Sequence, residues 1–87
     1  MAEVVLPASL VQLFPGCGRR VRVEAGTVQG VIDELDRRWP GMRNRLCATS
    51  RAIRQHIRIF VDAEPATLET PVAPASEVQI VPALSGG

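Results

Sequence analysis

The sequence predicts an α+β fold in which one main helix packs across a mixed sheet of four to five strands. Two observations lead to this fold class. Apolar residues recur at helical spacing through 28–39, and the segments 19–24, 57–62 and 77–81 alternate with the period of a strand. With 87 residues, of which 46% are hydrophobic, the chain is long enough for one domain with a modest core.

The first two strands are expected to form a hairpin. Residues 4–6 are a short apolar run that ends at Pro7, which cannot donate a hydrogen bond to a neighbouring strand. Residues 19–24 alternate cleanly, as expected of an antiparallel strand with one buried face. Its valines face inward and its arginines outward: Val21 and Val23 against Arg20 and Arg22.

The connection between these strands carries a helical turn and a tight turn. Ser9 is expected to cap the helical turn, with three apolar residues on one side: Leu10, Leu13 and Phe14. Residues 15–18 form a turn by composition, because their two glycines are free to adopt positive φ.

The main helix is predicted over residues 27–39. Thr27 is its expected N-cap, and Pro40-Gly41 ends it. Its acidic residues come earlier and its arginines later, as the helix dipole prefers. Five apolar residues form its buried stripe: Val28, Val31, Ile32, Leu35 and Trp39.

Two strands are expected in the remainder. The arginine-rich segment 42–55 is interpreted as a loop with at most one helical turn. Residues 57–62 form a strand, residues 63–65 turn the chain, and an irregular connection through Pro74 leads to the last strand at 77–81. We therefore expect a folded domain over 1–82 and a flexible tail over 83–87 that ends in Gly-Gly.

Composition excludes several classes of function. A formal net charge of +1 and three aromatic residues do not provide a nucleic-acid surface. Two cysteines and one histidine at unrelated spacing do not predict a metal site. No basic leader or membrane-length apolar run is present, so we expect a cytoplasmic protein with no membrane partner. All ten basic residues other than His56 are arginines, so no lysine is available for conjugation or Schiff-base chemistry.

The outward positions of the last two strands offer a docking surface for a partner. Alternation places Arg58 and Phe60 outward on one strand and Val81 outward on the other. An exposed phenylalanine beside arginines has the composition of an interface. A solvated sheet face with one stray aromatic residue is the alternative interpretation.

The order strand, strand, helix, strand, strand is the β-grasp arrangement of ubiquitin-like proteins. Residues 58–62, the helix 27–39 and the segment 77–87, which runs from a strand through Pro82 into Gly86-Gly87, resemble the MoaD/ThiS family of small sulfur carriers. That family includes the small subunit of molybdopterin synthase, the thiamine sulfur carrier and a carrier linked to a cysteine synthase. Members often have Asp-Gly turns where this chain has Asp62-Ala63-Glu64 and Ala75-Ser76-Glu77.

The resemblance implies that Gly87 is the reacting residue and that the protein is a cosubstrate, not an enzyme. The Gly87 carboxylate would be adenylated with ATP by a ubiquitin-activating-type enzyme and converted to a thiocarboxylate. A sulfur-accepting synthase, similar to cysteine synthase or to the large subunit of molybdopterin synthase, would take the sulfur. Gly86 and Ser85 would thread into the partner, with no cofactor bound to the carrier itself. Leu84 is an apolar residue in an otherwise slender tail, so we expect it to occupy a pocket of the partner; packing against its own domain is the alternative.

Other interpretations of the ending remain open. The glycines are also consistent with a frayed terminus, since chain ends are often disordered. A ubiquitin-like domain attached to target amines through Gly87, or one that only docks, would have the same pattern. An enzyme in its own right is disfavoured because the sequence contains no catalytic constellation.

Overall fold

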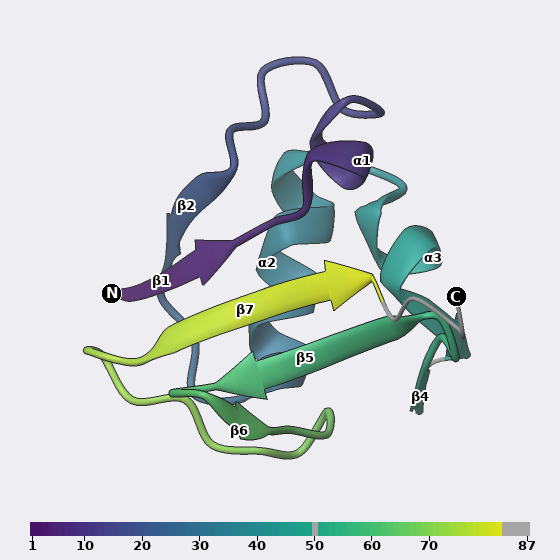
Figure 1. Cartoon of the computed structure of the whole chain (residues 1–87). Coiled ribbons are helices and arrows are strands. Elements are labelled where there is room, and N and C mark those ends of the chain that lie inside the picture. Colours follow the sequence, from purple (N-terminus) through teal and green to yellow (C-terminus); the bar gives the residue numbers. More distant parts are fainter. Residues whose placement is uncertain (50, 83–87) are drawn as a thin grey trace.

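In the computed structural model, which describes residues 1–49 and 51–82, a mixed sheet packs against a helical layer (Figure 1). The five sheet strands lie in the order β2-β1-β7-β5-β6, with β1 parallel to β7 and the other neighbours antiparallel. The elements follow the chain as β1 (Ala2–Val5), α1 (Ala8–Val11), β2 (Arg20–Val23), α2 (Val28–Arg38), α3 (Met42–Leu46), β3 (Cys47–Thr49), β4 (Ala52–Ile53), β5 (Ile57–Val61), β6 (Glu64–Pro65) and β7 (Glu77–Pro82). The predicted α+β class is confirmed.

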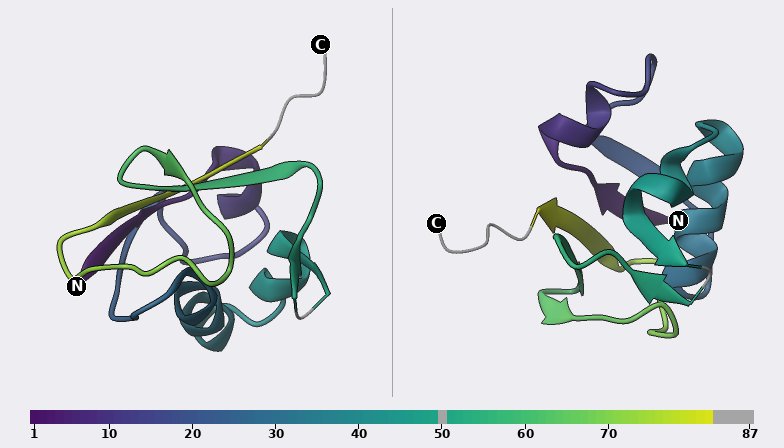
Figure 2. Two further views of the ribbon diagram at one scale, coloured as in Figure 1. Left: turned by 90° about the horizontal axis from the view of Figure 1, so that it is seen from below. Right: turned by 90° about the vertical axis from the view of Figure 1, so that its right-hand side faces the viewer.

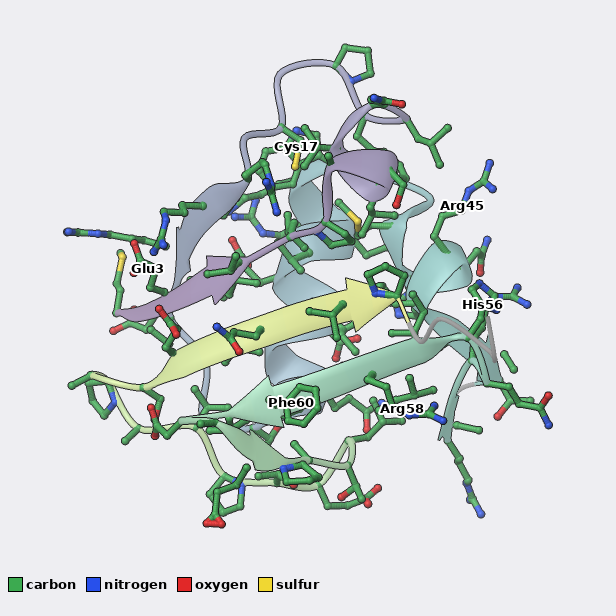
Figure 3. All side chains as sticks on the ribbon, viewed as in Figure 1. Glu3, Cys17, Arg45, His56, Arg58 and Phe60 are labelled. Carbon is green, nitrogen blue, oxygen red and sulfur yellow. The ribbon has the colours of Figure 1, made fainter. Side chains whose placement is uncertain are left out.

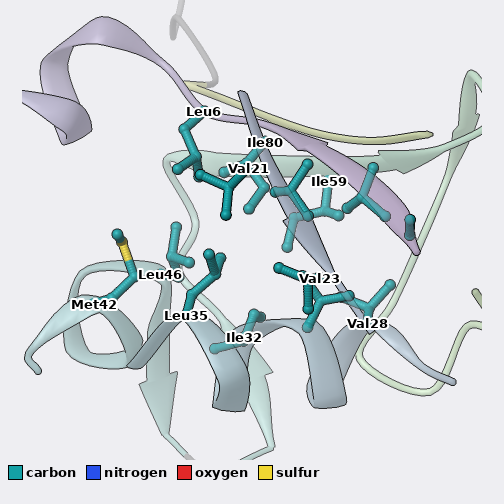
Figure 4. Close-up of a cluster of buried hydrophobic side chains, with 14 of the residues drawn as sticks. Leu6, Val21, Val23, Val28, Ile32, Leu35, Met42, Leu46, Ile59 and Ile80 are labelled. Atoms are coloured by element: carbon teal, nitrogen blue, oxygen red, sulfur yellow. The ribbon is translucent and has the colours of Figure 1, made fainter. Parts of the chain in front are cut away.

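Helices α2 and α3 lie on the same side of the sheet (Figure 2). Apolar side chains of α2 meet those of the strands in a continuous core, as Figure 4 shows for Leu35 and Ile32 opposite Ile59 and Ile80. The predicted alternation of β2, β5 and β7 is confirmed, since each strand buries every second residue. The core is therefore built from the face of the sheet that the sequence pattern indicates.

The N-terminus of α2 is held by two separate parts of the chain. The Thr27 hydroxyl accepts a hydrogen bond from the Gly30 N–H at 3.1 Å, which confirms the predicted N-cap. The irregular segment before β7 supplies two further acceptors: Val28 N–H donates to Thr70 O at 3.0 Å and Gln29 N–H to Leu68 O at 2.9 Å. These bonds satisfy N–H groups that have no acceptor within the helix.

The predicted cap of the first helical turn is wrong. Pro7, not Ser9, is the N-cap of α1, and no side chain caps this turn. Proline suits the start of a helix because its fixed φ, here −72°, is already close to the helical value. Leu10 is buried, whereas Leu13 is 49% exposed, so the expected apolar side of the turn is only partly used.

Residues 42–55 have more regular structure than a loop with one helical turn. The turn is present as α3, with Met42 and Leu46 fully buried, and β3 and β4 pair as a small antiparallel sheet after it. A carboxylate of α2 caps α3, because Asp36 Oδ1 accepts from Gly41 N–H at 3.1 Å and from Arg43 N–H at 3.0 Å. The capping group is thus supplied by the preceding helix rather than by the start of α3 itself.

The hairpin between β5 and β6 is tight although it contains no glycine. Asp62 and Ala63 adopt φ of 50° and 71°, in the left-handed region that favours glycine. The Asp62 carboxylate compensates by accepting from the Ser76 hydroxyl and from the Glu77 N–H, each at 2.9 Å. The turn is therefore tight without an Asp-Gly pair. It leads into the short strand β6, which was not expected from the sequence.

Ala63→Gly is expected to stabilise the domain by about 0.5–1 kcal/mol. Glycine removes the strain of a left-handed alanine, a gain that exceeds the entropy glycine adds to the unfolded chain. Urea unfolding measures the change. Ala75→Gly is the matched control, because Ala75 is exposed and its φ is not positive, so that substitution should lower stability. Equal destabilisation by both substitutions would contradict the strain argument.

Candidate functional site

Strand β7 positions the segment that carries the predicted reacting group. It lies at the centre of the sheet, between β1 and β5, and its last residue, Pro82, is opposite Ile57. The predicted tail residues Leu84, Ser85, Gly86 and Gly87 lie outside the described residues. The structure therefore defines the base of the tail, at Pro82, and the surfaces around that base.

The predicted docking residues share the face of the sheet opposite α2 (Figure 3). Arg58 and Val81 are direct cross-strand partners, and Phe60 lies two residues further along β5, opposite Gln79. Arg58 is exposed, and its Nη1 donates to Gln55 O at 2.8 Å. Phe60 and Val81 are half-buried. The geometry brings all three onto one surface, and their role in docking stays a prediction.

The structure adds two apolar residues to this face. Val5 is opposite Gln79 and Pro65 is opposite Phe60, so a row runs across four strands as Val5, Gln79, Phe60 and Pro65. Sequence reasoning missed Val5, because an uninterrupted apolar run does not reveal which side chains face outward. It missed Pro65 because that residue was interpreted as part of a turn.

Two hollows adjoin Pro82. A groove of about 510 Å³ lies between the end of β7 and the link from β1 to α1, with Val5, Pro7, Val81 and Pro82 in its wall. A smaller hollow of about 190 Å³ also includes Pro7 and Pro82, together with Leu10 and Leu13 of the first helical segment. Apolar surface therefore lies near the point where the chain leaves the sheet.

Charged pairs occupy the opposite end of the same face. Arg20 bridges Glu3 at 3.0 Å and Glu77 at 3.8 Å, and all three side chains are exposed. Exposed pairs of this kind contribute about 0–1 kcal/mol each, so they add little to the stability of the fold. The apolar part of this face therefore lies at its other end, near Pro82.

Neither cysteine is suited to carry sulfur as a reactive thiol. Cys17 and Cys47 are both free and buried. Burial raises the pKa of the Cys17 thiol, and it also raises that of Cys47 against the opposing effect of Arg43. A thiol with a raised pKa provides little of the nucleophilic thiolate at neutral pH.

Within residues 1–49 and 51–82, no three His, Cys, Asp or Glu side chains are grouped so that they could hold a metal ion. Over the same ranges, no helix has the length and apolar character needed to cross a bilayer.

A central strand that leads into the tail, one main helix across a mixed sheet and a partly apolar open face define a ubiquitin-like β-grasp domain. The family model described as "ThiS family" matches residues 4–87. The chain belongs to the ThiS family, whose members are small ubiquitin-like sulfur carriers. Carriers of this type are generally not enzymes. Comparison with curated proteins gives no match.

Solved structures support the same assignment. A chain in the crystal structure of the Amycolatopsis orientalis BexX/CysO complex has 25% identity and a TM-score of 0.86, with 100% of both chains covered. SAMP1 from Haloferax volcanii has 28% identity and a TM-score of 0.80, with 99% of this chain and 98% of that one covered. CysO of Mycobacterium tuberculosis shares the fold at 23% identity and a TM-score of 0.86, with 97% and 100% covered. The predicted β-grasp fold and MoaD/ThiS resemblance are confirmed.

Proposed function

We propose that the protein carries sulfur as a thiocarboxylate on Gly87 and donates it in a biosynthetic pathway. The observation that carries the proposal is the ThiS family match, which continues through residue 87 and so includes Gly86 and Gly87, separated from the end of β7 by three residues. A chain of five extended residues reaches at most about 17 Å, which is enough to enter a partner's site while the domain stays outside. Glycine has no side chain, so a narrow channel can close around it.

The chemistry takes place in two steps, both in partner active sites. The Gly87 carboxylate attacks the α-phosphorus of ATP, which forms an acyl adenylate and releases pyrophosphate. A sulfur donor at the oxidation level of hydrosulfide then attacks the acyl carbon, and AMP leaves with the electron pair of the broken C–O bond. The product is a thiocarboxylate, a sulfur nucleophile that an acceptor in a synthase can take up. ATP is the cosubstrate of the activating enzyme, and the carrier needs no bound cofactor of its own.

Two kinds of partner follow from this chemistry. One is an adenylating enzyme of the ubiquitin-activating type, and the other is a sulfur-accepting synthase that resembles cysteine synthase or the large subunit of molybdopterin synthase. The CysO structure in complex with BexX supports partner binding by a protein of this fold. Because activation consumes ATP, we place the exchange in the cytoplasm.

Intact-mass analysis tests the proposal. The full chain is incubated with the adenylating enzyme of its own organism, ATP and sulfide. Replacement of one carboxyl oxygen by sulfur at Gly87 is the expected result. An unchanged mass, with an enzyme shown to release pyrophosphate on another carrier, would refute the proposal.

Phe60→Ser is expected to weaken binding to the adenylating enzyme. A half-buried aromatic residue at the centre of an interface contributes about 2 kcal/mol, which corresponds to a roughly 30-fold rise in KM with kcat unchanged. Steady-state pyrophosphate release measures both constants. Phe60→Leu keeps an apolar side chain and should restore most of the affinity, provided that thermal melting shows both variants folded. A KM that both substitutions leave unchanged would remove Phe60 from the docking surface.

Conjugation to other proteins is the second candidate function. The 28% identity to SAMP1 favours it, because SAMP1 is named a small archaeal modifier protein. With no lysine, this chain could not form lysine-linked chains with itself. Isopeptide adducts in cell extracts that disappear when Gly87 is deleted would support conjugation, and their absence alongside thiocarboxylate formation would leave sulfur transfer alone.

A further inference from the structure

Positive charge is concentrated in one stretch of the chain. Residues 41–61 contain five of the ten arginines and the one histidine, and none of the nine acidic residues. The overall net charge of +1 hides this separation. The segment comprises α3, β3, β4 and β5, so the charges gather at the end of the molecule where β7 finishes, as Arg45, His56 and Arg58 show in Figure 3.

Most of these charges have no acidic partner among the described residues. Arg43 is neutralised by Asp33 at 2.9 Å and Asp36 at 3.2 Å. The other four arginines of the stretch form no ion pair within residues 1–49 and 51–82: Arg45, Arg51, Arg54 and Arg58. We call these four arginines and His56 the basic end. By contrast, the arginines of α2 are paired with Glu34.

The basic end includes a polar hollow of about 570 Å³ lined by Arg45, Arg54, His56, Asn44 and Gly41. Arg54 is fixed at its edge, because its Nε donates to Asn44 O at 2.7 Å. Arg45 and His56 also line the smaller hollow that includes Pro82. The hollow is therefore adjacent to the base of the tail and separate from the apolar row through Phe60.

We infer that the basic end is a second docking surface, and that it receives an acidic segment, rich in Asp and Glu, at the mouth of the partner channel that takes the tail. The inference rests on the proposed function. Guanidinium groups bind carboxylates in a two-point geometry, so the hollow between Arg45 and Arg54 suits an acidic side chain. Complementary charge raises the rate of encounter and fixes the orientation, so the molecule would approach with its tail toward the channel.

An acidic protein surface fits the basic end better than a nucleic acid does. A phosphate backbone needs a longer track of positive charge, and strands are usually held by aromatic stacking as well. The basic end contains no Phe, Tyr or Trp, since Trp39 and Phe14 pack against the core and Phe60 lies on the open sheet face. Exposed acidic residues elsewhere that form no ion pair within residues 1–49 and 51–82 would repel a polyanion that extended beyond the end, among them Glu24, Glu64 and Glu69.

Steady-state kinetics with the adenylating enzyme of the same organism tests the inference. Arg45→Gln/Arg54→Gln should lower kcat/KM about tenfold at low salt, leave kcat unchanged and weaken the dependence of kcat/KM on salt. Arg37→Gln/Arg38→Gln on α2 removes the same charge elsewhere and should stay within about twofold of the unmodified protein. Arg45→Glu is a second test variant, because no described hydrogen bond of the fold depends on Arg45; it should lower kcat/KM further.

The outcomes separate this inference from the proposed function. If the unmodified chain is activated but the basic-end and α2 variants have equal kcat/KM, the docking inference is overturned and the proposed function stands. If the unmodified chain is not activated, the proposed function fails, and NMR titration with a polyglutamate peptide then tests the docking surface by itself. Chemical-shift changes at the basic end that disappear in Arg45→Glu would support the surface. The absence of such changes in the unmodified chain would overturn it. Tighter binding of single-stranded oligouridylate than of polyglutamate at equal charge would also overturn it, in favour of a nucleic-acid site.

Discussion

Deletion of Gly87 is expected to abolish thiocarboxylate formation and leave the domain folded. Adenylation needs the carboxylate at the α-phosphorus, and one residue less withdraws it by about 3.3–3.6 Å, far more than the misplacement that already costs a large factor in rate. Intact mass after incubation with the adenylating enzyme, ATP and sulfide should show no sulfur. The described sheet and core are made by residues up to Pro82, so the melting temperature should not change.

Two matched variants sharpen that experiment. Addition of one alanine after Gly87 moves the carboxylate by the same length in the other direction and should be equally inactive. Gly87→Ala keeps the length and adds only a methyl group, so any loss there reports the width of the channel. If the chain that lacks Gly87 gained sulfur as fast as the unmodified chain does, the reacting group would have to be elsewhere.

Leu35→Ala is expected to lower the free energy of unfolding by about 2–5 kcal/mol. Leu35 is fully buried on α2 against the sheet, so its truncation removes apolar contacts and leaves a cavity. A loss of this size is a large part of the 5–15 kcal/mol that stabilises a typical domain. Urea unfolding should show a lower midpoint at an unchanged m-value.

Arg37→Ala is the control for that substitution. Arg37 lies on the same helix with 70% of its side chain exposed, and its ion pair within residues 1–49 and 51–82 is with Glu34, so the substitution should change the free energy of unfolding far less than Leu35→Ala does. A cost below about 1 kcal/mol for Leu35→Ala would contradict the described packing of α2 against the sheet.

The elements that sequence analysis predicted are those whose pattern is local. Alternation with a period of two predicts both the strands β2 and β5 and the face that each buries. The apolar stripe from Val28 to Leu35 does the same for α2.

The elements that sequence analysis missed are β3, β4 and β6, which have two or three residues each, too few to show a period. The helical turn expected in 42–55 is present as α3, but its cap, Asp36, belongs to the preceding helix. The turn before β6 has a left-handed Ala63 where a sequence pattern favours glycine, and it is held by contacts of Asp62 with Ser76 and Glu77.

The same distinction applies to the candidate site. Strand alternation was enough to place Arg58, Phe60 and Val81 on one face, as the structure has them. The hollows beside Pro82 could not be predicted, because segments far apart in the sequence come together at the end of β7. Pro7 lines both hollows, and His56 also lines the smaller one. The residues from Leu84 to Gly87 stay a prediction from family resemblance.

The central position of β7 has a mechanical consequence. Its hydrogen bonds to the antiparallel neighbour β5 run perpendicular to the strand axis, and those to the parallel neighbour β1 run at a slant across it. Traction applied beyond Pro82 therefore loads both ladders in shear at the same time. An edge strand peeled from its end would instead lose its bonds one after another. If the tail is bound by a partner as proposed, a pull on it would not separate the strands of the domain one hydrogen bond at a time.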